Sequence, residues 1–215
     1  LAEPKIVEGP EGLAIEESLM GVDSQGKILG TVDFKQINGA DQSNCTKPIL
    51  TRNKIKNGSW KKFKKPLRVR ASRPYQADYR MDHKGTKFLT YNRGTCDDNF
   101  DPVMSIYEYV NNNWQRIGNS MRFNQLGAVG GVDDIKINKD FTKIAFRKPV
   151  YVGTDSNDYI YFYFFNEIKN RWIFQDFSIP VNENDESFDI SDDFLTIAVR
   201  NPGDVNDSEY NSSIQ

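Results

Sequence analysis

Apolar and polar positions alternate along most of this chain, and one arrangement of them returns four times. In its full form it has an apolar run, a polar turn, a second apolar run, an acidic loop, an aromatic run and a Trp. The four turn segments cover residues 22–29, 81–88, 137–144 and 190–197. Repeats of about 50 residues are typical of propeller blades or stacked modules. The pattern therefore predicts a repeat fold.

Within each repeat, apolar side chains recur at every second position, which is the period of a β-strand. In the third repeat these are Ile135 and Ile137, Ile144 and Phe146, Tyr161 and Tyr163, and Trp172 and Phe174. We therefore predict an all-β protein, a β-propeller built from four-stranded antiparallel blades. The same period argues against one long helix per repeat, as in helical solenoids.

We expect units that start near residues 17, 77, 133 and 186, with the last one incomplete. Residues 1–16 form an N-terminal extension, and residues 17–215 hold about three and a half blades. An open ring of this kind leaves strand edges with unpaired backbone groups. We expect the ring to be completed by further residues of a longer chain, by a second copy or by another subunit.

The fourth position of each turn differs between repeats. Gly26 and Gly85 occupy it in the first two, where glycine adopts a positive φ at little cost. Phe141 and Phe194 occupy it in the last two. We therefore expect those two turns to be of another type, or shifted in phase by one residue.

Charge is segregated along the chain, although the net charge is only −2. Residues 42–77 hold eleven basic and no acidic residues, whereas residues 173–215 hold ten acids and one arginine. The basic stretch 47–73 suits a polyanion, such as a sulfated glycan, or an acidic partner, and nucleic acid is the least favoured of these. The alternative is a solvated strand pair with an edge protected by lysines. The candidate binding residues are Lys54, Lys56, Lys61, Lys62, Lys64, Lys65, Arg68, Arg70 and Arg73.

Acidic residues cluster in the equivalent loop of several repeats, and hard oxygen ligands suit calcium. None of the clusters has the spacing of a full calcium-binding loop, and Asn, Asp and Gly are also what tight loops contain. The candidate calcium ligands are Asp97, Asp98, Asp101, Asp155, Asp158, Asp204 and Asp207.

Two further features, the cysteines and the glycosylation sequons, bear on whether the protein is secreted. Cys45 and Cys96 fall in corresponding loops of the first two repeats, as a disulfide pair or as two free thiols. Four Asn-x-Ser/Thr sequons favour a secretory route and hence an extracellular, cell-surface or virion-surface location. Their acceptor residues are Asn44, Asn57, Asn206 and Asn211. No apolar stretch is long enough for a transmembrane helix.

No catalytic motif is apparent. His83 is the single histidine and lies in a turn, so serine or cysteine mechanisms that need a histidine base would rest on it alone. Trp60, Trp114 and Trp172 recur at one position of the repeat, which favours packing between blades over sugar stacking.

One segment of the second repeat, residues 103–118, reads Val-Met-Ser-Ile-Tyr-Glu-Tyr-Val-Asn-Asn-Asn-Trp-Gln-Arg-Ile-Gly. Together with residues 130–137, 141–146 and the loop 201–209, it resembles the divergent FG-GAP-like and WD-repeat-like propellers of algal, protist and large-virus surface proteins. The Phe-Gly pair that names the FG-GAP repeat is missing here. The resemblance implies a propeller and a role in adhesion or assembly.

These observations together predict a non-enzymatic, extracellular or surface propeller module that contacts a polyanion or glycan through the basic stretch. The alternative is a carbohydrate-active propeller enzyme, such as a lyase or a glycosidase.

Overall fold

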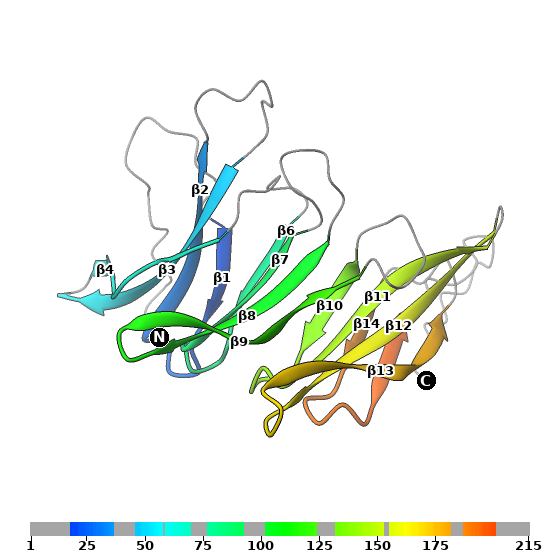
Figure 1. Cartoon of the computed structure of the whole chain (residues 1–215). Coiled ribbons are helices and arrows are strands. Elements are labelled where there is room, and N and C mark those ends of the chain that lie inside the picture. The colour runs from blue at the N-terminus through cyan, green and yellow to red at the C-terminus, as the bar shows by residue number, and fades with distance from the viewer. Residues whose placement is uncertain are drawn as a thin grey trace.

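The computed structural model describes residues 18–36, 46–57, 59–69, 77–92, 102–123, 132–152, 155–181 and 187–200. These residues form fifteen strands in four antiparallel sheets, and no helix occurs among them. The sheets follow one another in chain order and stand face to face, as blades do (Figure 1). The predicted all-β architecture of four-stranded antiparallel blades is confirmed.

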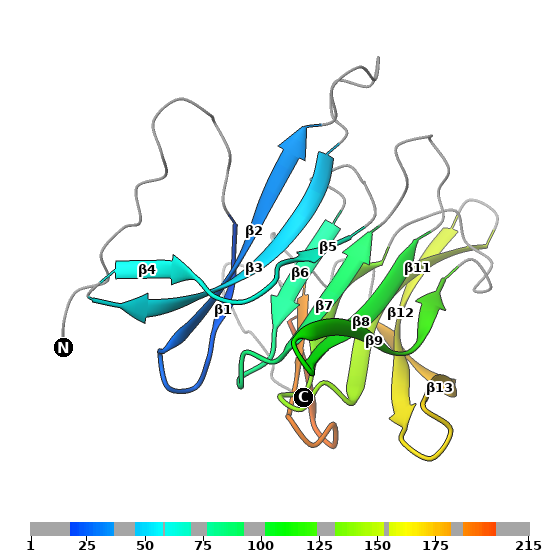
Figure 2. The same cartoon turned by 60° about the vertical axis from the view of Figure 1, so that its left-hand side comes forward.

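The first blade has the strand order β1-β2-β3-β4, and a short strand β5 also pairs with β3. Its strands are β1 (Ser18–Val22), β2 (Ile28–Gln36), β3 (Thr46–Lys56), β4 (Ser59–Lys62) and β5 (Leu67–Arg68). The β3–β4 hairpin projects from one end of the molecule, as the two views show (Figures 1 and 2).

The second and third blades repeat this order with longer outer strands. The second blade consists of β6 (Ala77–Met81), β7 (Lys87–Asn92), β8 (Val103–Val110) and β9 (Asn113–Arg122). The third consists of β10 (Asp133–Ile137), β11 (Lys143–Val152), β12 (Asp155–Asn166) and β13 (Arg171–Val181). A two-stranded half-blade follows, formed by β14 (Ser187–Ile190) and β15 (Ile197–Arg200).

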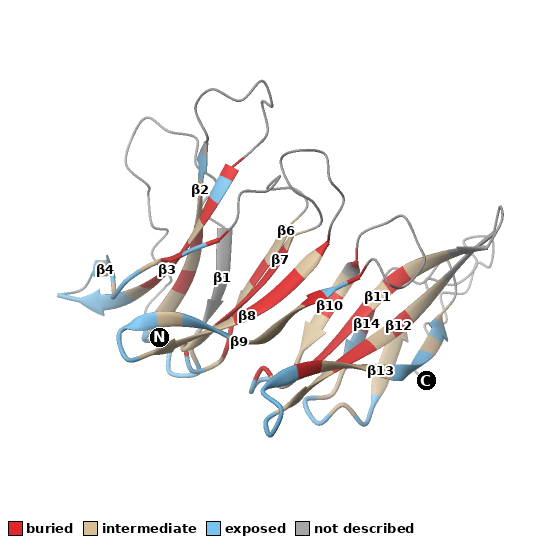
Figure 3. Cartoon of the chain, viewed as in Figure 1, coloured by how far each residue is buried: buried red, intermediate tan, exposed pale blue. Residues whose placement is uncertain are grey.

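Each pair of neighbouring sheets encloses a hydrophobic core of its own, because alternate side chains of every strand point toward the adjacent blade. Leu50 and Phe88 lie in the core between the first two blades, and Phe162 and Phe188 in the core beside the half-blade. Buried positions accordingly follow the strands in the middle of the molecule, and the β3–β4 hairpin is mostly exposed (Figure 3).

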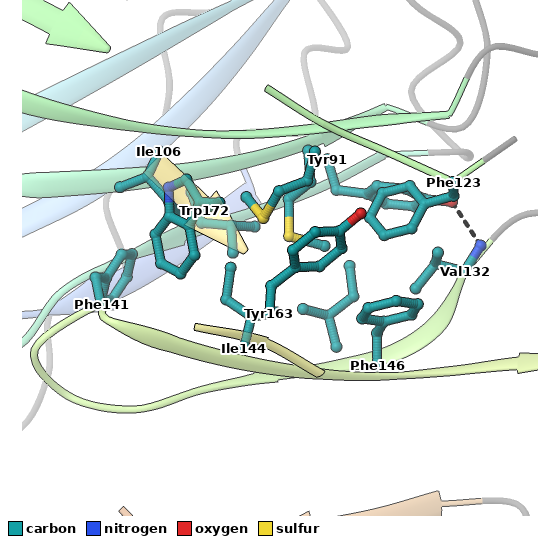
Figure 4. Close-up of a cluster of buried hydrophobic side chains, with 13 residues drawn as sticks. Tyr91, Ile106, Phe123, Val132, Phe141, Ile144, Phe146, Tyr163 and Trp172 are labelled. Atoms are coloured by element: carbon teal, nitrogen blue, oxygen red, sulfur yellow. Dashed lines mark hydrogen bonds between the residues drawn. The ribbon is translucent and has the colours of Figure 1, made fainter. Parts of the chain in front are cut away.

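The largest core lies between the second and third blades and is rich in aromatic rings (Figure 4). Phe123 packs edge-on against Phe146, with ring centroids 4.8 Å apart. The hydroxyl of Tyr91 accepts a hydrogen bond from the backbone N–H of Val132 (2.7 Å), so its polar end is satisfied within the core.

The turn between the first two strands has the same geometry in all four repeats. Gly26, Gly85, Phe141 and Phe194 all have a positive φ, between 57° and 66°. The backbone N–H of each donates to the carbonyl three residues earlier, at 2.9 Å in every case. The expectation of another turn type, or of a phase shift, at the two phenylalanines is therefore wrong.

Two features hold Phe141 in this unusual conformation. Its ring is buried between blades, at 4% exposure, which contributes about 2 kcal/mol and outweighs the left-handed backbone cost of about 1–2 kcal/mol. The side-chain oxygen of Asn138 also accepts hydrogen bonds from the backbone N–H groups of Thr142 (2.8 Å) and Lys143 (2.9 Å). The hydrogen bonds to Asn138 and the burial of the Phe141 ring together stabilise a positive φ that a glycine adopts at little cost.

The turns also connect neighbouring blades. Lys87 donates from its ammonium to the Asp140 carbonyl (2.8 Å), and Lys143, at the equivalent position, donates to the Asp193 carbonyl (2.7 Å). The backbone N–H of Lys139 donates to Asp192 (2.6 Å), and the Lys139 ammonium pairs with the same carboxylate (3.0 Å). These contacts lower the pKa of Asp192.

The close approach of the first two turns predicts different responses to two glycine substitutions. Gly26→Ala is expected to cost about 1 kcal/mol, the strain of a positive φ, because a Cβ there meets nothing within 4 Å. Gly85→Ala adds overlap with the Ile28 side chain, whose Cγ2 lies 2.9 Å from the added Cβ, and is expected to cost about 2–3 kcal/mol. Urea unfolding of both variants measures the difference, and equal losses would show that the blades separate freely at this point.

Candidate functional site

The predicted basic residues that the structure describes lie on and just after the β3–β4 hairpin of the first blade, and all are exposed. These are Lys54, Lys56, Lys61, Lys62, Lys64, Lys65 and Arg68. Arg70 and Arg73 lie outside the described residues. The structure therefore gathers most of the stretch on one structural element.

The pairing of β3 with β4 gives this hairpin two different faces. Lys54 stands directly opposite Lys61, so two like charges face each other on one side of the hairpin. On the other side Ile55 stands opposite Trp60, and Ile55 is 48% exposed. Cross-strand like charges destabilise a hairpin unless an anion lies near them.

Among the described residues, acidic partners are scarce on the cationic face. The ion pair of Lys62 with Asp33, at 3.2 Å, lies on the opposite face, because Lys62 is the residue next to Lys61 in β4. No described carboxylate forms an ion pair with Lys54, Lys61 or Lys64. The charge of this face is thus left for solvent or for a ligand.

Three aromatic rings from the first two blades lie under these cations: Phe63, which follows β4, Tyr109 of β8 and Trp114 of β9. The ammonium of Lys64 lies 5.3 Å from the ring centroid of Phe63 and 5.1 Å from that of Tyr109. Lys54 lies 5.6 Å from the Phe63 ring. We call Arg52, Lys54, Lys61, Lys64 and these three rings the cation–aromatic site.

Arg52 is the residue of this site that sequence reasoning missed. It lies on β3, on the same face as Lys54, and is only 5% exposed. Its guanidinium carbon lies 4.0 Å from the Tyr109 ring centroid and 5.0 Å from that of Trp114. Burial lowers the pKa of Arg52, and Tyr109 and Asp82 oppose that shift. One signal in the sequence could have indicated its burial: Arg52 comes two residues after Leu50, which is buried, and so lies on the same side of the strand.

Two hydrogen bonds fasten the segment after β4 to the second blade. The indole N–H of Trp114 donates to the Lys65 carbonyl (2.8 Å), and the Lys65 ammonium donates to the side chain of Asn113 (3.3 Å). The cation–aromatic site therefore spans the junction of two blades.

Two of the three repeated tryptophans, Trp114 and Trp172, pack between blades, as predicted. Trp114 stacks on Phe88 with centroids 4.5 Å apart. Trp172 is 2% exposed, and its indole N–H donates to the Ile117 carbonyl of the preceding blade (3.2 Å). Trp60, at the equivalent position of the first blade, is only partly buried.

Most of the other predicted sites fall outside the described residues: Asn44, Cys45, Cys96, Asp97, Asp98, Asp101, Asp204, Asn206, Asp207 and Asn211. Asp155 lies in β12, with its side chain not described, and Asp158 pairs with Arg147 at 3.6 Å. In the described ranges, no group of three or more His, Cys, Asp or Glu side chains is placed to hold a metal ion. Calcium binding, the disulfide and glycosylation, including that of Asn57, stay predictions.

The single histidine belongs to the contacts between turns. The Nδ1 of His83 donates to the Lys139 carbonyl at 2.7 Å, and the His83 carbonyl accepts from the backbone N–H of Ser24, also at 2.7 Å. These bonds join the first three blades.

No protein-family model matches the chain, and no curated protein matches it either. Its strand arrangement is nevertheless similar to that of solved structures. The β-propeller domain of the trilobed protease from Pyrococcus furiosus, which has an open velcro topology, aligns with 92% of this chain at 10% identity and a TM-score of 0.50. The chain has a β-propeller fold.

Two further structures agree with this fold. A hypothetical selenium-binding protein from Sulfolobus tokodaii aligns with 77% of the chain (10% identity, TM-score 0.51), and an acylaminoacyl peptidase aligns with 86% (10% identity, TM-score 0.50). The chain spans 41%, 53% and 28% of the selenium-binding protein, the protease domain and the peptidase, respectively. Similarity at this identity concerns the fold alone, so the resemblance to FG-GAP-like repeats stays a prediction.

Among the residues that the structure describes, there is no helix of the length and apolarity that crossing a membrane requires.

Proposed function

We propose that this propeller is a non-enzymatic module of a surface or extracellular protein, and that it binds a sulfated glycan through the cation–aromatic site. The observation that carries the proposal is the combination of aromatic rings with lysines that have no carboxylate partner among the described residues, where the β3–β4 hairpin meets the second blade. Lys54, Lys61 and Lys64 supply the charge. Phe63 and Tyr109 supply rings next to that charge.

The chemistry of a sulfated glycan matches both features. Its sulfate groups are fixed negative charges that exposed lysines attract, and its sugar rings offer apolar C–H faces that pack on aromatic side chains. A site made only to protect a strand edge needs the lysines and not the rings. The net charge of −2 gives this chain no general attraction to anions, so its binding depends on this local face.

The first test replaces the two facing lysines. Lys54→Ser with Lys61→Ser is expected to weaken binding to a sulfated polysaccharide about tenfold, since each exposed pair contributes roughly 0.5–1 kcal/mol. The slope of log affinity against log salt should fall by about 2, because each cation that neutralises a polyanion charge releases about one counterion. Isothermal titration at several salt concentrations measures both quantities.

A matched control removes the same charge elsewhere. Lys169 and Arg171 are exposed and lie at the β12–β13 turn of the third blade, away from the hairpin. Lys169→Ser with Arg171→Ser is expected to leave the affinity within twofold of the wild type. An equal loss in the control would mean that net charge, and not the cation–aromatic site, determines binding.

A product assay on the same titration samples separates binding from catalysis. Release of reducing sugar or of unsaturated ends from the polysaccharide would support the alternative of a carbohydrate-active enzyme and overturn the non-enzymatic proposal. Binding of DNA that competes equally with the polysaccharide would identify a general polyanion site instead.

A further inference from the structure

The environment of Arg52 contains an imbalance of hydrogen bonds. Its Nη1 donates to the Gly85 carbonyl of the second blade at 2.9 Å. Its Nε and Nη2 are buried and have no hydrogen-bond partner among the described residues. Leaving the N–H groups of a buried cation without acceptors is costly, and native proteins seldom do so without a reason.

The surrounding rings do not resolve this imbalance. Tyr109 and Trp114 stack on the guanidinium and attract its charge, but a ring face is a poor substitute for a lone pair. A methionine fills a similar volume against aromatic rings without any donor, and replacement of buried ions by apolar residues is often neutral or stabilising. Packing alone therefore does not require an arginine at this position.

The edge of Arg52 that carries Nε and Nη2 has the geometry of an anion site. Nε and Nη2 form the side of the guanidinium fork that binds two oxygens of a planar or tetrahedral oxyanion. Lys54 and Lys64 lie above the adjoining Phe63 ring, at 5.6 and 5.3 Å from its centroid. We propose that Arg52 is the oxyanion-binding group of the cation–aromatic site and takes one sulfate of a bound glycan between Nε and Nη2. This inference rests on the proposed function and names its central residue.

Phe63 is the side chain that gives way to the anion. Its ring centroid lies 5.6 Å from the Arg52 guanidinium carbon, it is only partly buried, and it follows β4 rather than lying within a strand. Its backbone N–H donates to the Arg52 carbonyl at 2.7 Å. Rotation of the Phe63 side chain, with its backbone held in place, is expected to open the fork to the anion. Tyr109 and Trp114 belong to strands of the second blade and remain as the floor of the site.

The test follows the Arg52 Nε–H resonance in ¹⁵N-labelled protein, assigned by its loss in Arg52→Lys. Titration with a trisulfated heparin-type disaccharide at fixed salt is expected to shift this resonance and to slow its exchange with water. The unsulfated disaccharide is expected to leave it unchanged. Arg52→Lys keeps a charge but loses the fork, and should bind the sulfated disaccharide at least tenfold more weakly.

Arg52→Met distinguishes a binding role from a structural one. Its Tm without ligand is expected to lie within about 3 °C of the wild type or above it, while binding is lost. Arg171→Met, at an exposed position of the third blade, should bind like the wild type. A large fall in the Tm of Arg52→Met, together with an unchanged affinity of Arg52→Lys for the sulfated disaccharide, would make Arg52 a structural residue and overturn the inference.

The outcome is separable from that of the proposed function. If the sulfated disaccharide binds while the Arg52 resonance stays in place, the inference fails and the glycan function stands on the lysines. If the disaccharide does not bind, inorganic sulfate is titrated against the same resonance in a chloride background. A shift then supports the Arg52 site and rejects the glycan, and the absence of a shift rejects both.

Discussion

Replacement of Trp172 by alanine is expected to lower the free energy of unfolding by about 3–5 kcal/mol, the range for a large buried aromatic side chain. Its ring is 2% exposed and packs on Phe165 at 5.2 Å between centroids. It also covers Gly118, where an added Cβ would lie 3.1 Å from the indole. Without the indole, the third blade loses its outer contact with the second. Urea or thermal unfolding measures the loss.

The control for this prediction is the same residue type in the first blade. Trp60→Ala is expected to cost less than about 1 kcal/mol, because no described sheet covers that face of the β3–β4 hairpin. Trp172→Phe should fall between the two, since it keeps a ring but loses the hydrogen bond to the Ile117 carbonyl. Equal losses for Trp60→Ala and Trp172→Ala would mean that another sheet packs on the first blade in solution.

Replacement of Asp82 by alanine is expected to cost about 2–4 kcal/mol, because its carboxylate organises the turn of the second blade. Asp82 is 2% exposed. It accepts hydrogen bonds from the backbone N–H groups of Thr86 and Lys87, both at 2.6 Å, and from the Thr86 hydroxyl at 3.0 Å. Alanine leaves these donors without an acceptor in a half-buried site. Chemical denaturation again supplies the measurement.

Asp82→Asn separates the shape of this turn from its charge. Asn138 makes the equivalent backbone hydrogen bonds in the third blade, so asparagine is expected to preserve the turn and cost less than about 1 kcal/mol. If asparagine is as destabilising as alanine, the negative charge of Asp82 near Arg52 matters more than its hydrogen bonds.

The blades were predictable from the sequence because the alternation of a strand is a local property. Residues such as Ile135 and Ile137 show the period of two without reference to the rest of the chain. The basic residues were predicted as one stretch of sequence, whereas their place on a hairpin, with Lys54 opposite Lys61, comes from the structure.

The alternation puts Arg52 on the same side of its strand as Leu50, but the side chains that bury it were not predictable from a local pattern. Its side chain is buried by Tyr109 and Trp114, which belong to the next repeat, so its environment depends on how two blades meet. The two phenylalanines at positive φ escaped prediction for a related reason. Local sterics disfavour Phe141 in that conformation, and only the core between blades stabilises it.

The four equivalent turns have a consequence for recognising further copies of this repeat in other sequences. Glycine is dispensable at the fourth turn position, whereas an oxygen-bearing side chain at the first position is present in every copy, as Asp23, Asp82, Asn138 or Ser191. That oxygen accepts from backbone N–H groups four or five residues later in all four repeats. A search profile that weights this side-chain acceptor, and admits aromatic residues where glycine is usual, should therefore detect relatives that a glycine-based motif overlooks.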